Sequence, residues 1–112
     1  MNTKVKGALG EAIAEKFLKK KGYKILFKNY TNAVGEIDIV AKFKDYIVFV
    51  EVKYKETAEM MLPREMVDVR KQNKLRGVAS MFLQEKRMSD VLCRFDVVEV
   101  LGDKITHIEN AF

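Results

Sequence analysis

Residues 46–53 read Tyr-Ile-Val-Phe-Val-Glu-Val-Lys, a run of strong β-formers with a carboxylate and an ammonium group near its far end. Because side chains alternate between the two faces of a strand, Glu51 and Lys53 are expected to point the same way. The sequence therefore predicts a buried strand that carries charge at one end.

A second stretch, Gly-Glu-Ile-Asp-Ile-Val at residues 35–40, precedes this strand, and its alternation places Glu36 and Asp38 on a common face. If the two strands pair as a hairpin, these acids meet Glu51 and Lys53 on one small patch. Two carboxylates about 5 Å apart repel by roughly 3 kcal/mol at an effective dielectric near 20. Such a cluster indicates a divalent-metal site.

The size and composition of the chain limit the possible classes of protein. Its 112 residues fit a single domain over residues 1–112, and a composition of 48% apolar and 33% charged residues is that of a globular protein. A net charge of +5 permits nucleic acid as a partner without identifying it. No apolar run approaches the ~18 residues of a membrane span, so no membrane partner is expected.

The chain contains one cysteine, Cys93, and one histidine, His107. A single cysteine rules out an internal disulfide and fits a reducing cytoplasm, which is the expected location. With one residue of each kind, a zinc site of His and Cys ligands is nearly excluded. Cys93 is interpreted as a strand residue rather than a nucleophile, and His107 is predicted to be the outward residue of an edge strand.

Apolar spacing predicts two helices and five strands in the order α-β-β-β-α-β-β. The first helix covers residues 7–21, and the second begins near Pro63 and runs to about Arg87. The apolar stripe of the first helix consists of Leu9, Ile13 and Phe17, widened by Ala12, Ala14 and Leu18. The strands are expected at residues 23–30, 35–43, 46–54, 93–101 and 104–109. This order predicts an α/β fold in which the two helices flank a mixed sheet of about five strands.

The second helix has an apolar stripe that turns polar toward its N-terminus. The stripe consists of Leu75, Val78, Ala79 and Phe82. Its continuation toward the N-terminus reaches Gln72, Lys71 and Asp68. Polar groups that face inward need partners, which a reaction centre or a ligand would supply. Alternatively, the start of the helix overhangs the sheet and these residues meet water. The sequence leaves both possibilities open.

The same helix carries the predicted nucleic-acid contacts, Arg70, Lys71, Gln72 and Lys74. Lysine and arginine at these positions would track a phosphate backbone without reading base sequence. The alternative is that the charged residues are only solvated.

Asp38 and Glu51 have the chemistry of a magnesium site. Mg²⁺ prefers oxygen ligands and keeps several waters, so one or two carboxylates are enough, and the carbonyl of Val52 would add a third oxygen. Mg²⁺, or Mn²⁺ in its place, would acidify a bound water and neutralise charge on a phosphate. Lys53 would hold or deprotonate the attacking water, or stabilise the pentavalent phosphate.

An Asp on one strand followed by Glu-x-Lys on the next resembles the PD-(D/E)xK nuclease core of restriction-endonuclease-like proteins, and the order of elements matches that core. The resemblance is closer still to the YraN-like family, a small uncharacterised group within that superfamily, and it covers nearly the whole chain. It is carried by Gly10-Glu11, Ala14, Leu18, Gly22-Tyr23, Asn29-Tyr30, residues 35–40, residues 49–53, Lys71, Leu75, residues 94–98 and residues 110–112.

The resemblance implies a metal-dependent phosphodiesterase site. It assigns Asp38 and Glu51 as the metal carboxylates and Lys53 as the motif lysine. Glu11 resembles the first-helix glutamate that archaeal Holliday-junction resolvases and related nucleases add to the site. Glu36 has no role fixed by the resemblance and is included as a neighbour of the metal ligands. The sequence departs from the name of the motif in having isoleucine, not proline, before Asp38.

The expected function is a Mg²⁺-dependent endonuclease that acts on DNA, with branched or repair-intermediate DNA as candidate substrates. The alternative is a non-catalytic nucleic-acid-binding accessory protein with a vestigial nuclease site. DNA is favoured over RNA, although no residue separates the two. A homodimer is compatible with this function because a small resolvase-like nuclease must reach two strands.

Overall fold

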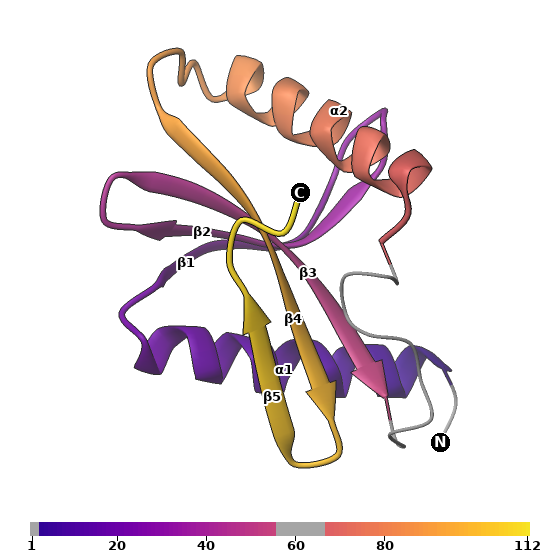
Figure 1. The fold of residues 1–112 in the computed structure, drawn as a ribbon. Helices are drawn as coiled ribbons and strands as arrows, with labels where there is room; N and C mark the ends of the chain where they lie inside the picture. The colour runs from indigo at the N-terminus through magenta and orange to yellow at the C-terminus, as the bar shows by residue number, and fades with distance from the viewer. Residues whose placement is uncertain (1–2, 56–66) are drawn as a thin grey trace.

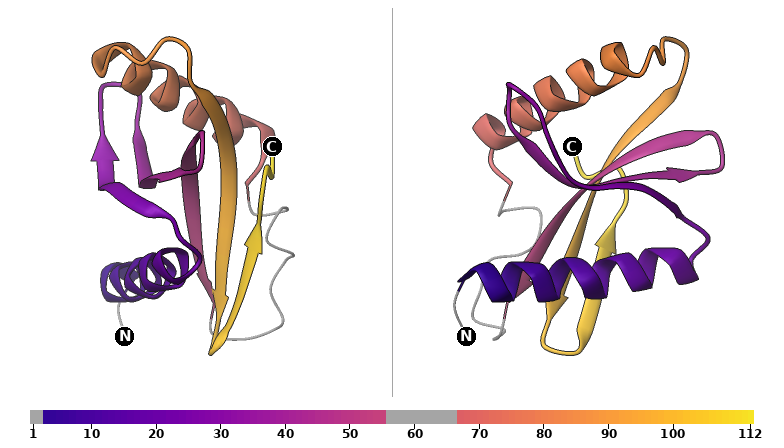
Figure 2. Two further views of the ribbon diagram at one scale, coloured as in Figure 1. Left: turned by 90° about the vertical axis from the view of Figure 1, so that its left-hand side faces the viewer. Right: turned by 180° about the vertical axis from the view of Figure 1, so that it is seen from behind.

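The computed structural model describes residues 3–55 and 67–112, in which two helices cover opposite faces of a five-stranded sheet (Figures 1 and 2). The elements are α1 Thr3–Lys20, β1 Lys24–Thr31, β2 Glu36–Phe43, β3 Tyr46–Lys55, α2 Val69–Glu85, β4 Leu92–Leu101 and β5 Lys104–Ile108. The strands follow one another in the order β1-β2-β3-β4-β5. β3 and β4 are parallel, and the other neighbours are antiparallel. The predicted α/β fold, its mixed sheet and its element order are confirmed.

β3 lies in the middle of the sheet and is covered on both faces, which suits its apolar run. Odd-numbered residues such as Phe49 pack under α2, whereas even-numbered residues such as Val50 pack under α1. This alternation places Glu51, and two residues later Lys53, on the α2 face of the sheet. The charged end of β3 therefore faces the helix whose start is polar.

α2 begins later than the sequence analysis expected. The predicted start near Pro63 lies outside the described residues, and Val67 and Asp68 are not helical. Asp68 is the N-cap of α2, and its side chain accepts a hydrogen bond from the Lys71 N–H at 2.9 Å. The predicted apolar stripe of this helix is confirmed, because Leu75, Val78, Ala79 and Phe82 are all buried. Neither helix, over the residues described, is long and apolar enough to cross a membrane.

The predicted apolar stripe of α1 is confirmed in part. Ala14 and Leu18 are fully buried and Ile13 and Phe17 pack against the same core, but Leu9 is 38% exposed. Gly10, next to Leu9, is buried and meets β3, because a Cβ at Gly10 would lie only 2.9 Å from the Tyr54 Cβ. The absence of a side chain at this position thus allows the helix to approach the strand, which apolar periodicity alone does not reveal.

This close approach predicts opposite effects for two glycines in one helix. Gly10→Ala is expected to lower the free energy of unfolding by about 1–3 kcal/mol, because the helix and β3 must move apart. Gly7→Ala is the control: its Cβ would have no neighbour within 4 Å, and alanine favours a helix by about 0.5–1 kcal/mol over glycine. Urea unfolding followed by circular dichroism measures both changes. A neutral Gly10→Ala would contradict the packing of α1 on β3.

Candidate functional site

The candidate site lies where β2 and β3 separate. The backbone pairing of these strands ends at Ile39 and Val50. Just beyond that pair, the Asp38 carboxylate accepts a hydrogen bond from the Val52 N–H at 2.8 Å, and so replaces the main-chain acceptor that β2 no longer provides. The N–H and C=O of one strand residue point to the same side of the strand, so the Val52 carbonyl also faces this gap. The separation of the strands therefore creates a small site lined by oxygen atoms.

Asp38 and Glu51 are brought together in this site, as predicted. The Glu51 side chain is 8% exposed, and its carboxyl group lies close enough to Asp38 to change the pKa of that residue. Burial, together with the hydrogen bond and charge of Glu51, raises the pKa of Asp38 from 3.8 to about 8. The Val52 N–H and the Lys71 charge lower the pKa of Asp38 but do not compensate. In the absence of a cation, Asp38 therefore holds a proton at neutral pH.

Lys71 at the start of α2 reaches this pair of carboxyl groups. Its Nζ lies 3.2 Å from Glu51 Oε2. The other polar residues of the helix start have local partners: Asp68 caps the helix, and Gln72 Nε2 donates to the Val67 carbonyl at 2.8 Å. The structure thus bears out parts of both possibilities left open by the sequence: Lys71 has a buried carboxylate as its partner, and the side chains of Lys71 and Asp68 are exposed to water.

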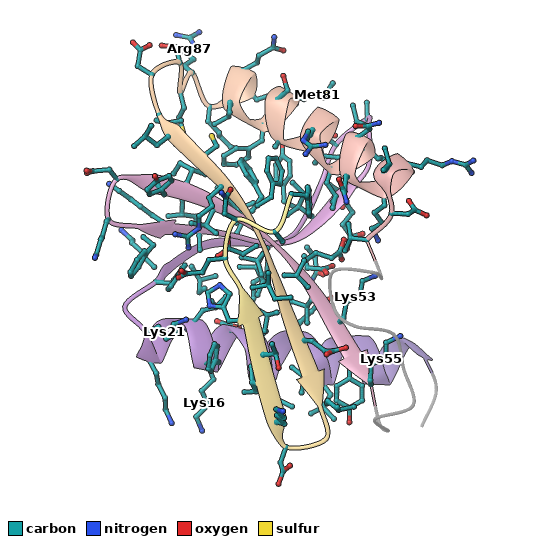
Figure 3. All side chains as sticks on the ribbon, viewed as in Figure 1. Lys16, Lys21, Lys53, Lys55, Met81 and Arg87 are labelled. Atoms are coloured by element: carbon teal, nitrogen blue, oxygen red, sulfur yellow. The ribbon has the colours of Figure 1, made fainter. Side chains whose placement is uncertain are left out.

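The other three predicted site residues, Lys53, Glu11 and Glu36, have weaker links to the site than Asp38 and Glu51. Among the interactions of the described residues, none joins Lys53 to Asp38 or Glu51. Lys53 lies on β3 (Figure 3), two residues after Glu51 and so on the same face of the strand. Burial is the main cause that raises the pKa of Glu11, and the Asp38 charge adds to it. Glu36 is exposed and also raises the pKa of Glu11. Glu11 thus adds a third carboxylate to the electrostatics of the site, and Glu36 lies at its edge.

The donor set fits a divalent cation such as Mg²⁺ or Mn²⁺. Asp38, Glu51 and the Val52 carbonyl supply only oxygen atoms, and Mg²⁺ is commonly held by one or two carboxylates with waters in the remaining positions. Within residues 3–55 and 67–112, no group of three or more His, Cys, Asp or Glu side chains is arranged to hold a metal. A cation here would replace the proton on Asp38 and remove the repulsion between the two carboxylates, so the residues present fit a two-carboxylate site.

Three basic residues, Arg70, Lys71 and Lys74, form what we term the α2 basic row. All three are exposed and lie in the first two turns of the helix. The Lys74 side chain extends over the turn between β1 and β2, since a Cβ at Gly35 would lie 3.0 Å from Lys74 Cε. Positive charge therefore extends from the carboxylate pair to the neighbouring turn, and its contact with nucleic acid stays a prediction.

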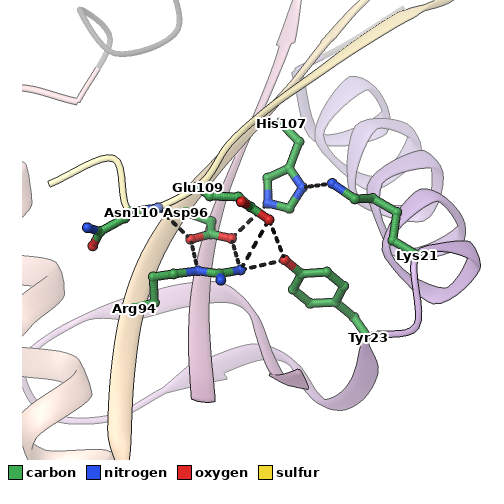
Figure 4. Close-up of polar contacts among 7 residues, drawn as sticks. All are labelled: Lys21, Tyr23, Arg94, Asp96, His107, Glu109 and Asn110. Carbon is green, nitrogen blue, oxygen red and sulfur yellow. Dashed lines mark hydrogen bonds and ion pairs between the residues drawn. The ribbon is translucent and has the colours of Figure 1, made fainter. Parts of the chain in front are cut away.

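A second polar cluster, on the α1 face of the sheet, was not predicted (Figure 4). Asp96 on β4 is fully buried and accepts hydrogen bonds from Arg94 Nε and Nη2, both at 2.9 Å, and from the Asn110 N–H at 3.0 Å. His107 Nε2 lies 2.7 Å from the same carboxylate. Lys21 Nζ lies 2.7 Å from His107 Nδ1 and must donate there, because an ammonium group has no acceptor. The imidazole ring of His107 therefore lies between the Lys21 ammonium group and the Asp96 carboxylate.

The prediction for His107 is thus half wrong. β5 is an edge strand, but the His107 side chain is only 3% exposed and packs edge-on against Phe17 and Tyr23. One sequence signal pointed to the cluster: Arg94 and Asp96 are two residues apart in an otherwise apolar strand and so share a face. That face is buried under α1, where Asp96 also binds His107 of β5 and the main chain of Asn110 after it, so the pair holds both segments in place.

Comparison with known proteins places the chain among relatives of unknown function. A family model described as "Uncharacterised protein family UPF0102" matches residues 10–100. UPF0102 proteins of Clostridioides difficile (strain 630) and Alkaliphilus oremlandii are each 46% identical to this chain, with all of both chains covered. A UPF0102 protein of Caldanaerobacter subterraneus subsp. tengcongensis is 42% identical over all of this chain and 98% of its own length. The names of these relatives state a family and no activity.

Proposed function

The chain belongs to the uncharacterised protein family UPF0102, and we propose that it is a divalent-metal-dependent nuclease that cuts DNA phosphodiester bonds. The YraN-like membership expected from the sequence is confirmed by these matches. The observation that carries the proposal is the placement of the Asp38 and Glu51 carboxyl groups next to each other, beside the main chain of Val52. Two carboxylates in a mostly buried site repel each other, and a divalent cation removes that repulsion.

Each residue of the site has a role in this proposal. Asp38, Glu51 and the Val52 carbonyl hold the cation, which supplies an acidified water and neutralises charge on the phosphate. Lys53 holds or deprotonates the attacking water, or stabilises the pentavalent phosphate. Glu11 contributes negative charge that favours a hydrated cation at the same position.

DNA is the substrate that we favour, with branched or repair-intermediate forms as candidates. The net charge of +5 and the α2 basic row support binding to a phosphate backbone through charge rather than base sequence. One observation favours the second candidate, an accessory protein that binds nucleic acid through a vestigial site: no described interaction joins Lys53 to the two carboxyl groups.

A cleavage assay separates the two candidates. Purified protein is incubated with a four-way junction, a flap, single-stranded DNA, duplex DNA and matched RNA, each with Mg²⁺ or Mn²⁺. We expect cleavage of at least one DNA that EDTA stops and that Lys53→Ala removes. Lys16→Ala makes the same change of charge at an exposed position on α1 and is the control (Figure 3). Tight binding without cleavage under either metal would favour the accessory protein instead.

A further inference from the structure

Lys71 is the exposed partner of a buried carboxylate in the Asp38–Glu51 pair. Its ammonium group lies 3.2 Å from Glu51 Oε2, and among the described residues it is the one cation within 4.0 Å of either carboxyl group of the pair. The carboxylate is 8% exposed, whereas the lysine side chain is 45% exposed. The buried member of the ion pair is therefore held by the sheet, and the exposed member has solvent to move into.

The backbone of Lys71 is fixed even though its side chain is exposed. Its N–H donates to the Asp68 cap at 2.9 Å, and the following residue, Gln72, donates through both its main chain and its side chain to the residues just before the helix. Only the flexible four-carbon stem can then change the position of the charge. The ammonium group can leave Glu51 without any movement of α2.

The ammonium group of Lys71 lies where the two carboxyl groups require a positive charge. Glu51 is almost fully buried beside Asp38, and the ammonium group at 3.2 Å is the positive charge that the chain itself supplies to offset the repulsion between the two carboxylates. A divalent cation would meet the same need with twice the charge. The lysine and the cation therefore compete for the same carboxylate.

We infer that Lys71 is a built-in counter-ion of the carboxylate pair, which stabilises the metal-free protein and sets the metal affinity by competing with the divalent cation for Glu51. This inference rests on the proposed metal site and adds a regulating residue to it. A cation held by the two carboxylates would release the ammonium group of Lys71 from Glu51 and leave its charge available, with those of Arg70 and Lys74, in the α2 basic row.

Calorimetric titration of the metal-free protein with MnCl₂ tests the inference. Lys71→Met keeps an unbranched stem without the charge, and we expect it to bind Mn²⁺ about tenfold more tightly than the wild type. Without metal, the same variant should melt at a lower temperature, because Glu51 loses its partner. Lys74→Met, one turn further along α2, is the control and should change neither quantity. Lys71→Arg retains the charge and should bind Mn²⁺ no more tightly than the wild type.

The outcomes separate this inference from the proposed function. Equal or weaker Mn²⁺ binding by Lys71→Met, with binding by the wild type intact, overturns the role of Lys71 and leaves the metal site standing. Binding by Lys71→Met alone supports the competition. Absence of Mn²⁺ binding in the wild type and in both Lys71 variants overturns the metal site and the inference together.

Discussion

Replacement of Asp38 by asparagine is expected to reduce metal-dependent DNA cleavage by about 10²- to 10³-fold and, at the same time, to stabilise the metal-free protein. The loss of activity follows because a neutral amide is a poor ligand for Mg²⁺, whose charge supplies several kcal/mol to a phosphoryl transition state. The stabilisation follows because the amide oxygen can still accept from the Val52 N–H while its NH₂ group donates to Glu51. The substitution of Asp38 thus removes the repulsion between the two carboxylates and, with it, the ability of the site to hold a cation.

The stabilisation should depend on pH in a defined direction. In the folded protein the pKa of Asp38 is raised from 3.8 to about 8, so between these values the folded chain holds a proton that the unfolded chain has released. The contribution of Asp38 to stability is therefore complete below about pH 4 and declines as the pH rises toward about 8. Because asparagine does not titrate, the advantage of Asp38→Asn should grow over this range to about 1–3 kcal/mol.

Urea unfolding at several pH values, in EDTA and then in Mn²⁺, measures this advantage. Mn²⁺ should raise the stability of the wild type and leave the variant unchanged, since only a site that binds the ion gains from it. Glu51, Lys71 and Glu11 are the charged groups that act on Asp38 or are acted on by it, and they are unchanged in the variant. An Asp38→Asn protein that is less stable at pH 8, or that still gains stability from Mn²⁺, would contradict this account of the site.

Replacement of Asp96 by alanine is expected to cost about 3–5 kcal/mol of unfolding free energy, because removal of one member of a buried ion pair leaves the other without a counter-charge. Asp96 is fully buried, and Arg94, its partner, is 12% exposed. The substitution also leaves the His107 ring and the Asn110 N–H without their acceptor. Asp103→Ala, at the exposed turn between β4 and β5, is the control and should change stability by less than about 0.5 kcal/mol.

Protonation of Asp96 should contribute to the loss of stability of the wild type at low pH. Burial by itself would raise the pKa of this carboxyl, but hydrogen bonds from His107, Arg94 and the Asn110 N–H outweigh burial and hold the pKa below its ordinary value of 3.8. The contribution of Asp96 is therefore complete above about pH 4 and is lost as the pH falls through the lowered value. Chemical unfolding of wild type and Asp96→Ala at neutral pH measures the main effect, and a loss below about 1 kcal/mol would show that the cluster is not an anchor.

Local sequence patterns were sufficient to predict most of the helices and strands. The run Ile47 to Val50 has β-branched and aromatic side chains that suit a strand buried on both faces, and the spacing of Leu75, Val78 and Phe82 suits one face of a helix. The shared face of Glu51 and Lys53 follows in the same way from the alternation of a strand. The expected burial of Leu9 and the expected exposure of His107 were wrong, because both depend on contact between distant segments of the chain.

The amino-acid sequence by itself determined the α/β class, the order of elements and the pairing of Asp38 with Glu51 across neighbouring strands, because each follows from a repeat of two or 3.6 residues or from a short connection. Only the tertiary structure decided that Lys71, rather than Lys53, contacts Glu51 and that Asp96 collects Arg94 and His107 on the other face. The physical reason is that periodicity tells which residues share a face, whereas the element that covers that face, and at which residue, is set by how α1 and α2 pack on the sheet.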